Sequence, residues 1–368
     1  MYIYEQRDWP NFTWNKEEIL SLLSTISHRQ GRLIGRMESL GFDLQAEANL
    51  ESMTLEVLKS NEIEGELLDR DEVRSSIARK LGLDLAGLVH SDRHVDGVVE
   101  VMLDATQHFR EALTPERLFA WHAAVFPAGR TGMQKIVVGN WRTNPPDDPM
   151  QVVSGPMGKE RVHFKAPDST VLENEMDLFI NWVNSDIEKN ALVKAAIAHL
   201  WFVTIHPFDD GNGRLARTIT DMLLARADGI PQRFYSMSAQ IRVERKAYYD
   251  ILEKTQRGTT DITAWLRWFL ECLDRALASS EKGLLKILYK AKYWDKLKDH
   301  RLNERQHKMI NKLLDEFEGK LTSSKWAKIC KCSQDTAGRD IQDLITKGVL
   351  KKEAAGGRST SYLLAEIG

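Results

Sequence analysis

The chain has 368 residues, of which 42% are hydrophobic and 28% are charged, so its composition is that of an ordinary soluble protein with two or three domains. Three cysteines exclude a disulfide framework, no run approaches the roughly 18 apolar residues of a membrane span, and the N-terminus lacks the apolar core of a signal peptide. We therefore expect a cytoplasmic protein that makes no membrane contact.

The net charge of −2 excludes no class of partner, but the charge is distributed unevenly along the chain. Residues 282–368 hold 19 lysines and arginines against 11 acidic residues, which leaves 32 against 42 for residues 1–281. This asymmetry predicts a separate basic unit at the C-terminus. The expected domains are an N-terminal helical region at 1–95, a second domain at 96–280, a helical connector at 281–302 and a C-terminal domain at 303–368.

Two long helices are predicted near the N-terminus, at 16–40 and 44–61, from apolar residues that recur at helical spacing. The second helix ends in the sequence SNEIEG. Ser60 and Glu64 are four residues apart, so their side chains face the same way, and Gly65 follows as a C-cap.

Helix continues to dominate after this point, with further helices predicted at 69–80, 94–112 and 115–125. Residues 129–168 change character, because their glycines and prolines rule out long helices. Within them, 151–154 and 161–164 can pair as a hairpin around 155–158.

The residues from His206 to Arg217 read HPFDDGNGRLAR and join a buried helix at 191–204 to a helix expected at 215–227. The first backbone N–H groups of a helix have no internal partner and carry the positive end of the helix dipole. The two glycines permit turns that aim successive N–H groups into one concavity. This stretch therefore predicts an anion site.

The side chains of the same stretch suit the transfer of a phosphorus centre. Arg214 and Arg217 share a helix face and can grip neighbouring phosphates. Asp210 is placed to hold a hard divalent cation, and His206 can take a proton from an incoming hydroxyl.

The stretch resembles the signature of the Fic family, H-x-F-x-[D/E]-G-N-G-R-x-x-R, at every specified position. The resemblance implies a mainly helical bundle with a small hairpin flap, and an enzyme that moves AMP from ATP onto a protein hydroxyl with Mg²⁺ present. It implies a catalytic base at His206, a metal ligand at Asp210, a phosphate cradle at Gly211, Asn212 and Gly213, and clamps on the β- and γ-phosphates at Arg214 and Arg217, with Arg214 counted as catalytic beside His206.

The end of the second helix resembles the inhibitory motif of Fic proteins, [S/T]-x-x-x-E-[G/N], at Ser60, Glu64 and Gly65. The resemblance implies that Glu64 pairs with Arg217 and removes the clamp needed for the γ-phosphate, so that the enzyme is autoinhibited. The alternative is a solvated acidic helix end.

Two further features follow from the resemblance. In Fic proteins a hairpin flap binds the target segment as an added strand, which places the protein substrate along residues 150–165; the alternative is a surface loop. The family pattern Tyr-Tyr-x-x-Leu falls on Tyr248 and Tyr249 in a helix predicted at 243–252. Either ring could stack on adenine or pack in the core.

The C-terminal residues 303–364 are predicted to form a winged helix, an α+β fold, with three helices, strands at 349–350 and 362–364, and a wing turn at 355–358. This is a DNA-binding architecture. Its third helix, however, carries three aspartates, which weakens a phosphate-facing surface. DNA binding and protein docking both stay open, as does a homodimer. The aspartates are Asp335, Asp340 and Asp343.

Two other functions compete with AMP transfer. A Fic-type enzyme could transfer phosphate or phosphocholine, or the protein could be a transcription regulator whose Fic domain senses a nucleotide. The complete Gly-Asn-Gly sequence and both arginines favour the α-phosphate of ATP, and an intact His206 argues against a sensor, because sensing needs no base.

Overall fold

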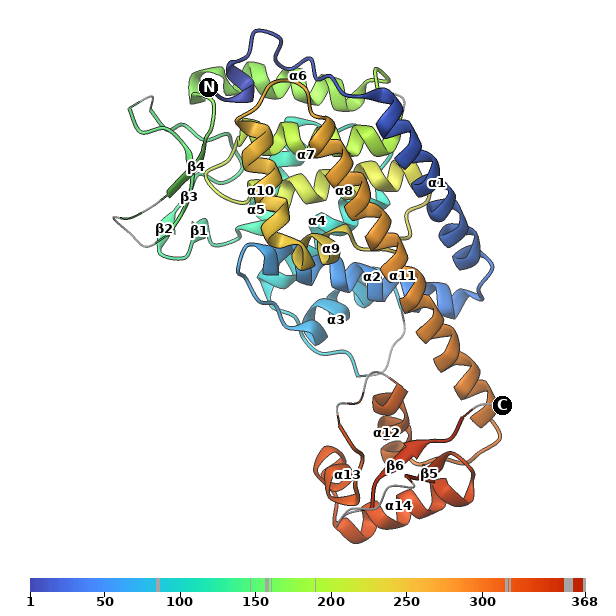
Figure 1. Cartoon of the computed structure of the whole chain (residues 1–368). Coiled ribbons are helices and arrows are strands. Elements are labelled where there is room, and N and C mark those ends of the chain that lie inside the picture. The colour runs from blue at the N-terminus through green and yellow to red at the C-terminus, as the bar shows by residue number, and fades with distance from the viewer. Residues whose placement is uncertain are drawn as a thin grey trace. The chain divides into compact units, whose positions relative to one another are not determined.

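The computed structural model describes residues 1–83, 87–145, 147–155, 159, 161–188, 190–314, 317, 319–353 and 360–366. The chain divides into two compact units, Met1–Glu281 and Lys282–Gly368 (Figure 1). The regions expected at 1–95 and 96–280 lie together in the first of these units. Helix dominates, as predicted, and strands are few and short.

The helices of the first unit include four that the sequence does not predict, and the others begin close to the predicted positions. In chain order, the helices are η1 (Ile3–Glu5), α1 (Lys16–Glu38), α2 (Phe42–Ile63), α3 (Arg70–Lys80), α4 (Arg93–Gln107), α5 (Pro115–Val125), η2 (Ser169–Val171), α6 (Leu172–Asn184), α7 (Ala191–Ile205), α8 (Asn212–Asp228), α9 (Met237–Val243), α10 (Arg245–Gln256) and α11 (Thr263–Leu297), which continues into the second unit. The four that the sequence does not predict are η1, η2, α6 and α9. Polar caps fix several of these starts; the Asn15 side chain, for example, accepts from the Glu18 N–H at 3.3 Å.

The centre of the first unit is formed by α7 and α8. Every residue of α7 from Leu192 to Ile205 is buried, so this helix touches neighbours on all faces. In Figure 1, α6 lies on one side of the pair and α2 on the other. Trp265 of α11 is fully buried and donates its indole N–H to the Ala196 carbonyl at 2.8 Å, which fixes α11 on α7.

Some helix boundaries differ from those expected. The helix after the motif begins at Asn212 rather than at 215, so Gly213 and Arg214 lie in its first turn. The apolar spacing starts only at Leu215, whereas the helix starts where left-handed Gly211 turns the chain. The helix expected at 94–112 ends at Gln107, the one expected at 243–252 is α10, and α9 before it is not predicted.

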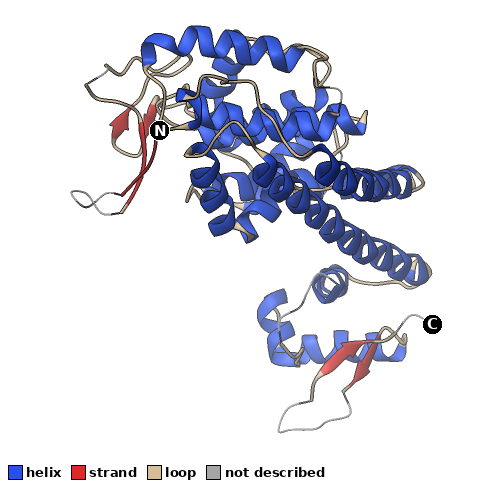
Figure 2. Ribbon diagram, turned by 45° about the horizontal axis from the view of Figure 1, so that its top comes forward, coloured by secondary structure: helices blue, strands red, loops and turns tan. Residues whose placement is uncertain are grey.

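Two antiparallel hairpins interrupt the helices (Figure 2). The first joins β1 (Arg130–Thr131) to β2 (Gln134–Lys135), and the second joins β3 (Gln151–Ser154) to β4 (Arg161–Lys165). The second is the hairpin that the sequence predicts. Its expected turn at 155–158 lies outside the described residues apart from position 155.

The second unit has three helices followed by a hairpin, in the predicted order. They are α12 (Glu304–Leu314), α13 (Ser323–Cys330), α14 (Gln334–Thr346), β5 (Leu350–Lys352) and β6 (Tyr362–Leu364). Met309, Trp326, Ile341 and Leu344 form its buried core. The wing turn expected at 355–358 falls outside the described residues.

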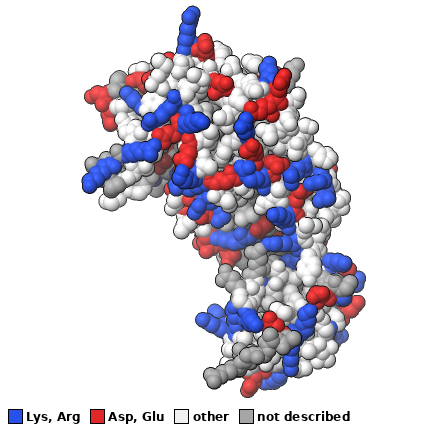
Figure 3. All heavy atoms as spheres, in the orientation of Figure 1, with Lys and Arg blue, Asp and Glu red and all other residues white. Residues whose placement is uncertain are grey.

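The visible surface carries both signs of charge. On the face in Figure 3, basic and acidic side chains are interspersed over the first unit. Within the part of the chain that the structure describes, no helix is long and apolar enough to cross a membrane.

Candidate active site

The loop between α7 and α8 is held in shape by its own residues. His206 ends α7 in a left-handed conformation, with φ 54°, and Gly211 turns the chain into α8 with φ 79°. A Cβ at position 211 would lie 2.7 Å from the Phe126 ring, so only glycine fits. The Asn212 side chain closes the loop by accepting from the Phe208 N–H at 2.9 Å and donating to the Phe208 carbonyl at 2.7 Å.

This closure decides which groups of the expected phosphate cradle are available. The Asn212 amide side chain is used within the loop, and Phe208 is fully buried as its anchor. The Leu215 N–H reaches back to the Gly211 carbonyl at 2.9 Å, which leaves the amides of 212–214 as the unpaired first turn of α8. A phosphate would therefore meet backbone N–H groups here and not the asparagine side chain.

His206 is arranged as a neutral base. Its Nδ1 lies 3.2 Å from the Val203 carbonyl, so the proton sits on Nδ1 and donates there, and Nε2 keeps its lone pair. Burial lowers the pKa of the imidazole to about 4. The side chain is thus neutral at physiological pH and able to accept a proton.

Arg142 fixes the position of His206. It is 2% exposed and donates from Nε to the His206 carbonyl at 2.8 Å, from Nη1 to the Asn144 side chain and from Nη2 to the Pro167 carbonyl, both at 2.5 Å. Its backbone N–H also reaches the Pro207 carbonyl at 2.9 Å. Sequence reasoning gave Arg142 no role, although an arginine in a segment rich in glycine and proline was a usable signal.

His122 supports the acidic part of the loop from α5. Its Nδ1 accepts from the Gly139 N–H at 3.2 Å, so its Nε2 carries the proton and donates to the Asp210 carbonyl at 3.1 Å. The ring stacks on Phe208 with centroids 4.2 Å apart. Burial lowers the pKa of His122, which favours the neutral tautomer that both bonds require.

Asp210 is the residue expected to hold a metal ion. One of its carboxylate oxygens accepts from the Gly211 N–H at 2.6 Å, whereas the neighbouring Asp209 bonds the Val137 N–H at 2.8 Å. Among the described residues there is no cluster of three histidine, cysteine or acidic side chains that could hold a metal. A single carboxylate fits Mg²⁺ only where phosphate oxygens and water complete its shell.

Arg217 is buried against the end of α2. Its Nε donates to the Ser60 hydroxyl at 2.9 Å, and Nη2 contacts both the Ser60 carbonyl and Glu64 Oε1 at 2.8 Å. Glu64 also lies against Gly213, where any Cβ would overlap its carboxylate, and Gly65 follows with φ 88°. The fold therefore brings Ser60, Glu64 and Arg217, all of which the sequence singles out, into direct contact.

Both arginines of the loop keep buried donors without a partner. Arg217 Nη1 and Arg214 Nε have no hydrogen-bond acceptor in the described structure. Unpaired buried donors are uncommon and costly, so each arginine is partly unsatisfied as it stands. An anion at the start of α8 would satisfy them.

The two tyrosines of α10 have different surroundings. Tyr248 is 2% exposed, and its hydroxyl lies 2.8 Å from His199 Nε2 in the core between α7 and α10. Tyr249 is only partly buried, and the Arg245 guanidinium lies 5.1 Å from its ring centroid. Of the two rings, Tyr249 is therefore the one that a ligand can reach.

The β3–β4 hairpin is anchored to α10 through β4. Arg257 donates to the carbonyls of Val162 and His163 at 3.0 Å, and Glu253 contacts His163 Nδ1 at 2.7 Å. Since β4 is held in this way, β3 is the strand left with an outer edge for another segment.

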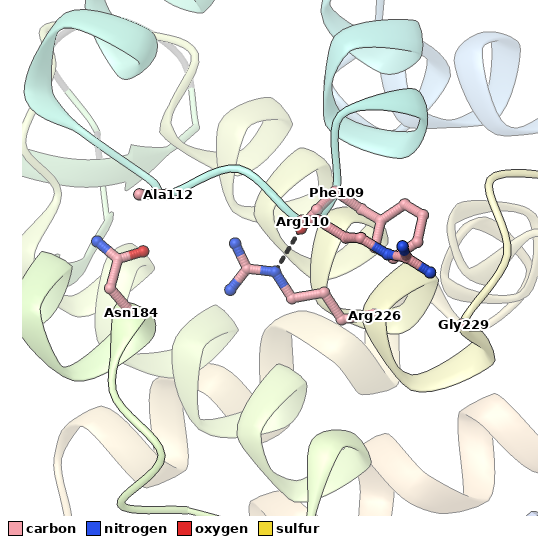
Figure 4. Close-up of a pocket in the computed structure, with 6 residues that line it drawn as sticks. All are labelled: Phe109, Arg110, Ala112, Asn184, Arg226 and Gly229. Atoms are coloured by element: carbon pink, nitrogen blue, oxygen red, sulfur yellow. Dashed lines mark hydrogen bonds between the residues drawn. The ribbon is translucent and has the colours of Figure 1, made fainter.

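A separate pocket of about 440 Å³ lies away from these residues (Figure 4). Arg226 crosses it and donates from Nε to the Phe109 carbonyl at 2.5 Å. None of the residues expected to act in catalysis lines it; its lining residues are Phe109, Arg110, Ala112, Asn184, Arg226 and Gly229.

Two protein families match parts of this chain. Residues 112–224 match the family described as the Fic/DOC family, which covers α5 to α8 and the whole loop. Residues 2–83 match a domain of unknown function, DUF4172, which covers α1 to α3 and the Ser60–Gly65 segment.

Curated relatives are named protein adenylyltransferase Fic. That of Nematostella vectensis is 24% identical over 232 residues, 60% of this chain and 47% of the relative. That of Aedes aegypti is 37% identical over 107 residues, 28% of this chain and 19% of the relative. The chain thus spans less than half the length of these relatives.

Solved structures share the fold. A Fic family protein from Desulfovibrio desulfuricans G20 superposes with a TM-score of 0.53 at 20% identity, over 98% of this chain and 99% of the other. A Fic domain containing signaling protein from Bacteroides thetaiotaomicron gives 0.51 at 19% identity, over 73% and 96%. Fold and matched residues together define a protein with a Fic domain. More particularly, its curated relatives are nucleotidyltransferases by name.

Proposed function

We propose that this protein transfers AMP from ATP to a hydroxyl side chain of a target protein, and that Glu64 inhibits it in the conformation described here. The observation that carries this proposal is the neutral His206, with Nε2 unprotonated, on the same loop as two arginines that keep unpaired buried donors. A base and an incompletely satisfied cationic site are the two parts that transfer of a nucleotide needs.

The residues divide the work as follows. The target hydroxyl attacks the α-phosphorus of ATP, the bond from that phosphorus to the bridging oxygen of the β-phosphate breaks, and pyrophosphate leaves. His206 Nε2 takes the hydroxyl proton. The backbone amides of Asn212, Gly213 and Arg214, with the side chains of Arg214 and Arg217, hold the phosphates.

Mg²⁺ fits this site as a partner of ATP. When bound, it supplies positive charge to the phosphates. Asp210 is the carboxylate that would hold it, and His122 keeps the Asp210 backbone in place through the 3.1 Å bond to its carbonyl.

Glu64 opposes the reaction by charge and by position. Its carboxylate contacts Arg217 at 2.8 Å and lies over Gly213, so it takes a cationic partner from the γ-phosphate and repels that phosphate. The target segment would add to the outer edge of β3 within residues 150–165, which uses backbone hydrogen bonds and no sequence code.

Labelling with radioactive ATP tests the proposal. In the Glu64→Gly variant, label from α-³²P-ATP should appear on protein and label from γ-³²P-ATP should not. Label from γ-³²P-ATP would indicate phosphate transfer, whereas nucleotide binding without any label would favour a sensor. The matched control is Glu64→Gly combined with His206→Ala, which should bind ATP and transfer label about 10²–10⁴-fold more slowly.

For residues 303–366 one observation favours DNA as the partner. Asp340 is buried and pairs with Arg305 at 2.7 Å, and Asp343 contacts Lys347 at 2.5 Å, so neighbours neutralise two of the three aspartates that weakened a phosphate-facing α14. We propose that α14 meets duplex DNA. A gel shift should weaken steeply between 50 and 200 mM salt, to the extent of roughly 10³-fold if several phosphates are contacted.

A further inference from the structure

Glu66, two residues beyond the Ser60–Gly65 segment, also contacts an arginine of the catalytic loop. Its Oε2 lies 2.8 Å from Arg214 Nη1. The residue sits in the short connection between α2 and α3, whereas Arg214 lies in the first turn of α8. The end of α2 and the residues after it therefore present two carboxylates, Glu64 and Glu66, to the two arginines of the loop.

Arg214 is buried, so its guanidinium depends on this contact for a negative charge. Its side chain is 10% exposed, its guanidinium lies 4.6 Å from the Phe126 ring centroid, and Nη1 is 3.5 Å from Asn61 Oδ1. A guanidinium taken out of water in this way needs a full negative charge nearby. Glu66 supplies that charge, and a phosphate could supply it in exchange.

Glu66 is also held in place by a histidine. His94, in the first turn of α4, contacts Glu66 Oε1 through Nε2 at 2.6 Å. The contact with His94 lowers the pKa of Glu66, and the same contact raises the pKa of His94. Each carboxylate oxygen thus has its own partner, which fixes the direction of the other oxygen toward Arg214.

We propose that Glu66 is a second inhibitory carboxylate, which occupies Arg214 while Glu64 occupies Arg217, and that His94 positions it. This inference rests on the proposed role of Arg214 as a phosphate ligand of ATP. Removing Glu64 alone frees one arginine, and ATP must still displace Glu66 from the other. Full release of the site requires both carboxylates to leave.

The dissociation constant of ATP in the presence of MgCl₂, measured on the full chain by calorimetry, tests this. Glu66→Gln keeps the shape of the side chain but removes its charge, so ATP should bind at least about fivefold more tightly than to the parent. Glu64→Gly with Glu66→Gln should bind more tightly than either single variant. The matched control is Glu51→Gln, which removes a carboxylate of α2 that pairs with Arg70 at 2.5 Å, and its affinity should equal that of the parent.

His94→Ala separates positioning from direct contact. Alone it should tighten ATP binding by less than Glu66→Gln, and in the Glu66→Gln background it should change nothing, because its effect passes through Glu66. If His94→Ala changed ATP affinity equally in the parent and in Glu66→Gln, His94 would not act through Glu66.

Two results would overturn the role of Glu66. Unchanged ATP affinity in Glu66→Gln, with an unchanged melting temperature, would mean that its contact with Arg214 does not compete with phosphate. Weaker binding would mean that Glu66 holds Arg214 ready for the nucleotide. If affinity rises as expected but no variant transfers label from α-³²P-ATP, the inference stands and AMP transfer fails.

Discussion

Two groups of ion pairs lie along the contact of α2 and α8, and they differ in how far their acidic side chains are exposed to water. In one, Arg233 pairs with Asp228 at 2.5 Å and with Asp221 at 3.4 Å, and all three side chains are 2–3% exposed. In the other, the buried Arg217 and Arg214 pair with Glu64 and Glu66, whose side chains are 32% and 37% exposed.

The difference lies in whether a partner can be exchanged. Asp228 also accepts from Tyr235 at 3.0 Å and from Gln30, so leaving it would break several bonds inside the core. Glu64 and Glu66 are partly exposed to water, and the arginines that they contact keep unpaired donors. Arg233, whose partners are buried, therefore belongs to the structural framework, whereas Arg214 and Arg217 are the arginines that we propose bind phosphate.

The largest effect is expected from His206→Ala, made in the Glu64→Gly background so that transfer can be measured. Label from α-³²P-ATP should appear about 10²–10⁴-fold more slowly, while ATP affinity stays nearly the same, because a general base acts only as the hydroxyl attacks. Initial rates and calorimetry measure the two quantities. A parent rate with normal ATP binding would show that His206 is not the base.

Arg233→Ala should destabilise the protein by removing the arginine of the fully buried group. Because it strands buried carboxylates, it should lower the free energy of unfolding by about 3–5 kcal/mol, measured in urea. The control is Arg242→Ala, which removes a 40% exposed arginine paired with Glu62 at 3.0 Å and should cost at most about 1 kcal/mol. Equal losses would mean that burial of the partner does not distinguish the two groups.

Lowering the pH should decrease the free energy of unfolding, because the buried His199 is held neutral in the folded protein. Its Nε2 faces the Tyr248 hydroxyl and its Nδ1 the Thr220 hydroxyl, each at 2.8 Å, and burial lowers its pKa to about 3. The unfolded chain, with a histidine pKa of about 6.5, binds more protons below that pH, so this contribution is complete above 6.5 and is lost as the pH falls. From pH 8 to pH 5 the loss is about 2 kcal/mol for one histidine.

The measurement is the free energy of unfolding at both pH values for the parent and for His199→Gln. The variant should lose about 2 kcal/mol less than the parent over this interval. His108→Gln, at an exposed histidine, is the control and should follow the parent. The same loss in all three proteins would contradict a neutral, buried His199.

Glu64→Gly tests the group of ion pairs whose acidic side chains are partly exposed. Labelling should rise by about fivefold or more, and Glu64→Asp should be intermediate, because the shorter side chain reaches Arg217 less well. Stability should change little or fall slightly, because the pair is partly buried and Arg217 loses its carboxylate partner. The gain should disappear when Arg217→Ala is added. Equal labelling by parent and Glu64→Gly would return the segment to an ordinary helix end.

The smallest effect is expected from deleting residues 300–368. Both groups of ion pairs lie in the first compact unit, Met1–Glu281, so labelling by the Glu64→Gly variant should continue at its own rate. Loss of labelling while circular dichroism still reports a folded protein would show that the C-terminal unit is part of the active assembly.

Local signals in the sequence were sufficient for most helices and for the loop residues, because caps and apolar spacing act over a few positions. Asn15 caps α1 as its side-chain type predicts. The start of α8 was missed, since the Asn212 side chain and left-handed Gly211 set it three residues before the apolar pattern begins. The short helix α9, which the Ser236 side chain caps by accepting from the Ala239 N–H, was not predicted.

Most of the contacts that define the site could not be predicted from the sequence. Glu66 and Arg214 are 148 residues apart, and Arg142 and His206 are 64 apart, so no spacing rule connects them. The choice between Tyr248 and Tyr249 likewise depends on which ring faces His199, and that depends on the packing of α10 against α7. Only the family pattern gave a hint of the Glu64–Arg217 contact.

The bonds of Arg142 also have a consequence for the β3–β4 hairpin. One guanidinium joins Asn144 and Pro167, the two ends of the segment that carries β3 and β4, and the Ser169 hydroxyl adds a 2.6 Å bond to the Asn144 carbonyl. β3 and β4 therefore leave from and return to one fixed base. Because the guanidinium that closes this base also donates to the His206 carbonyl, a single side chain sets the position of both the hairpin and His206.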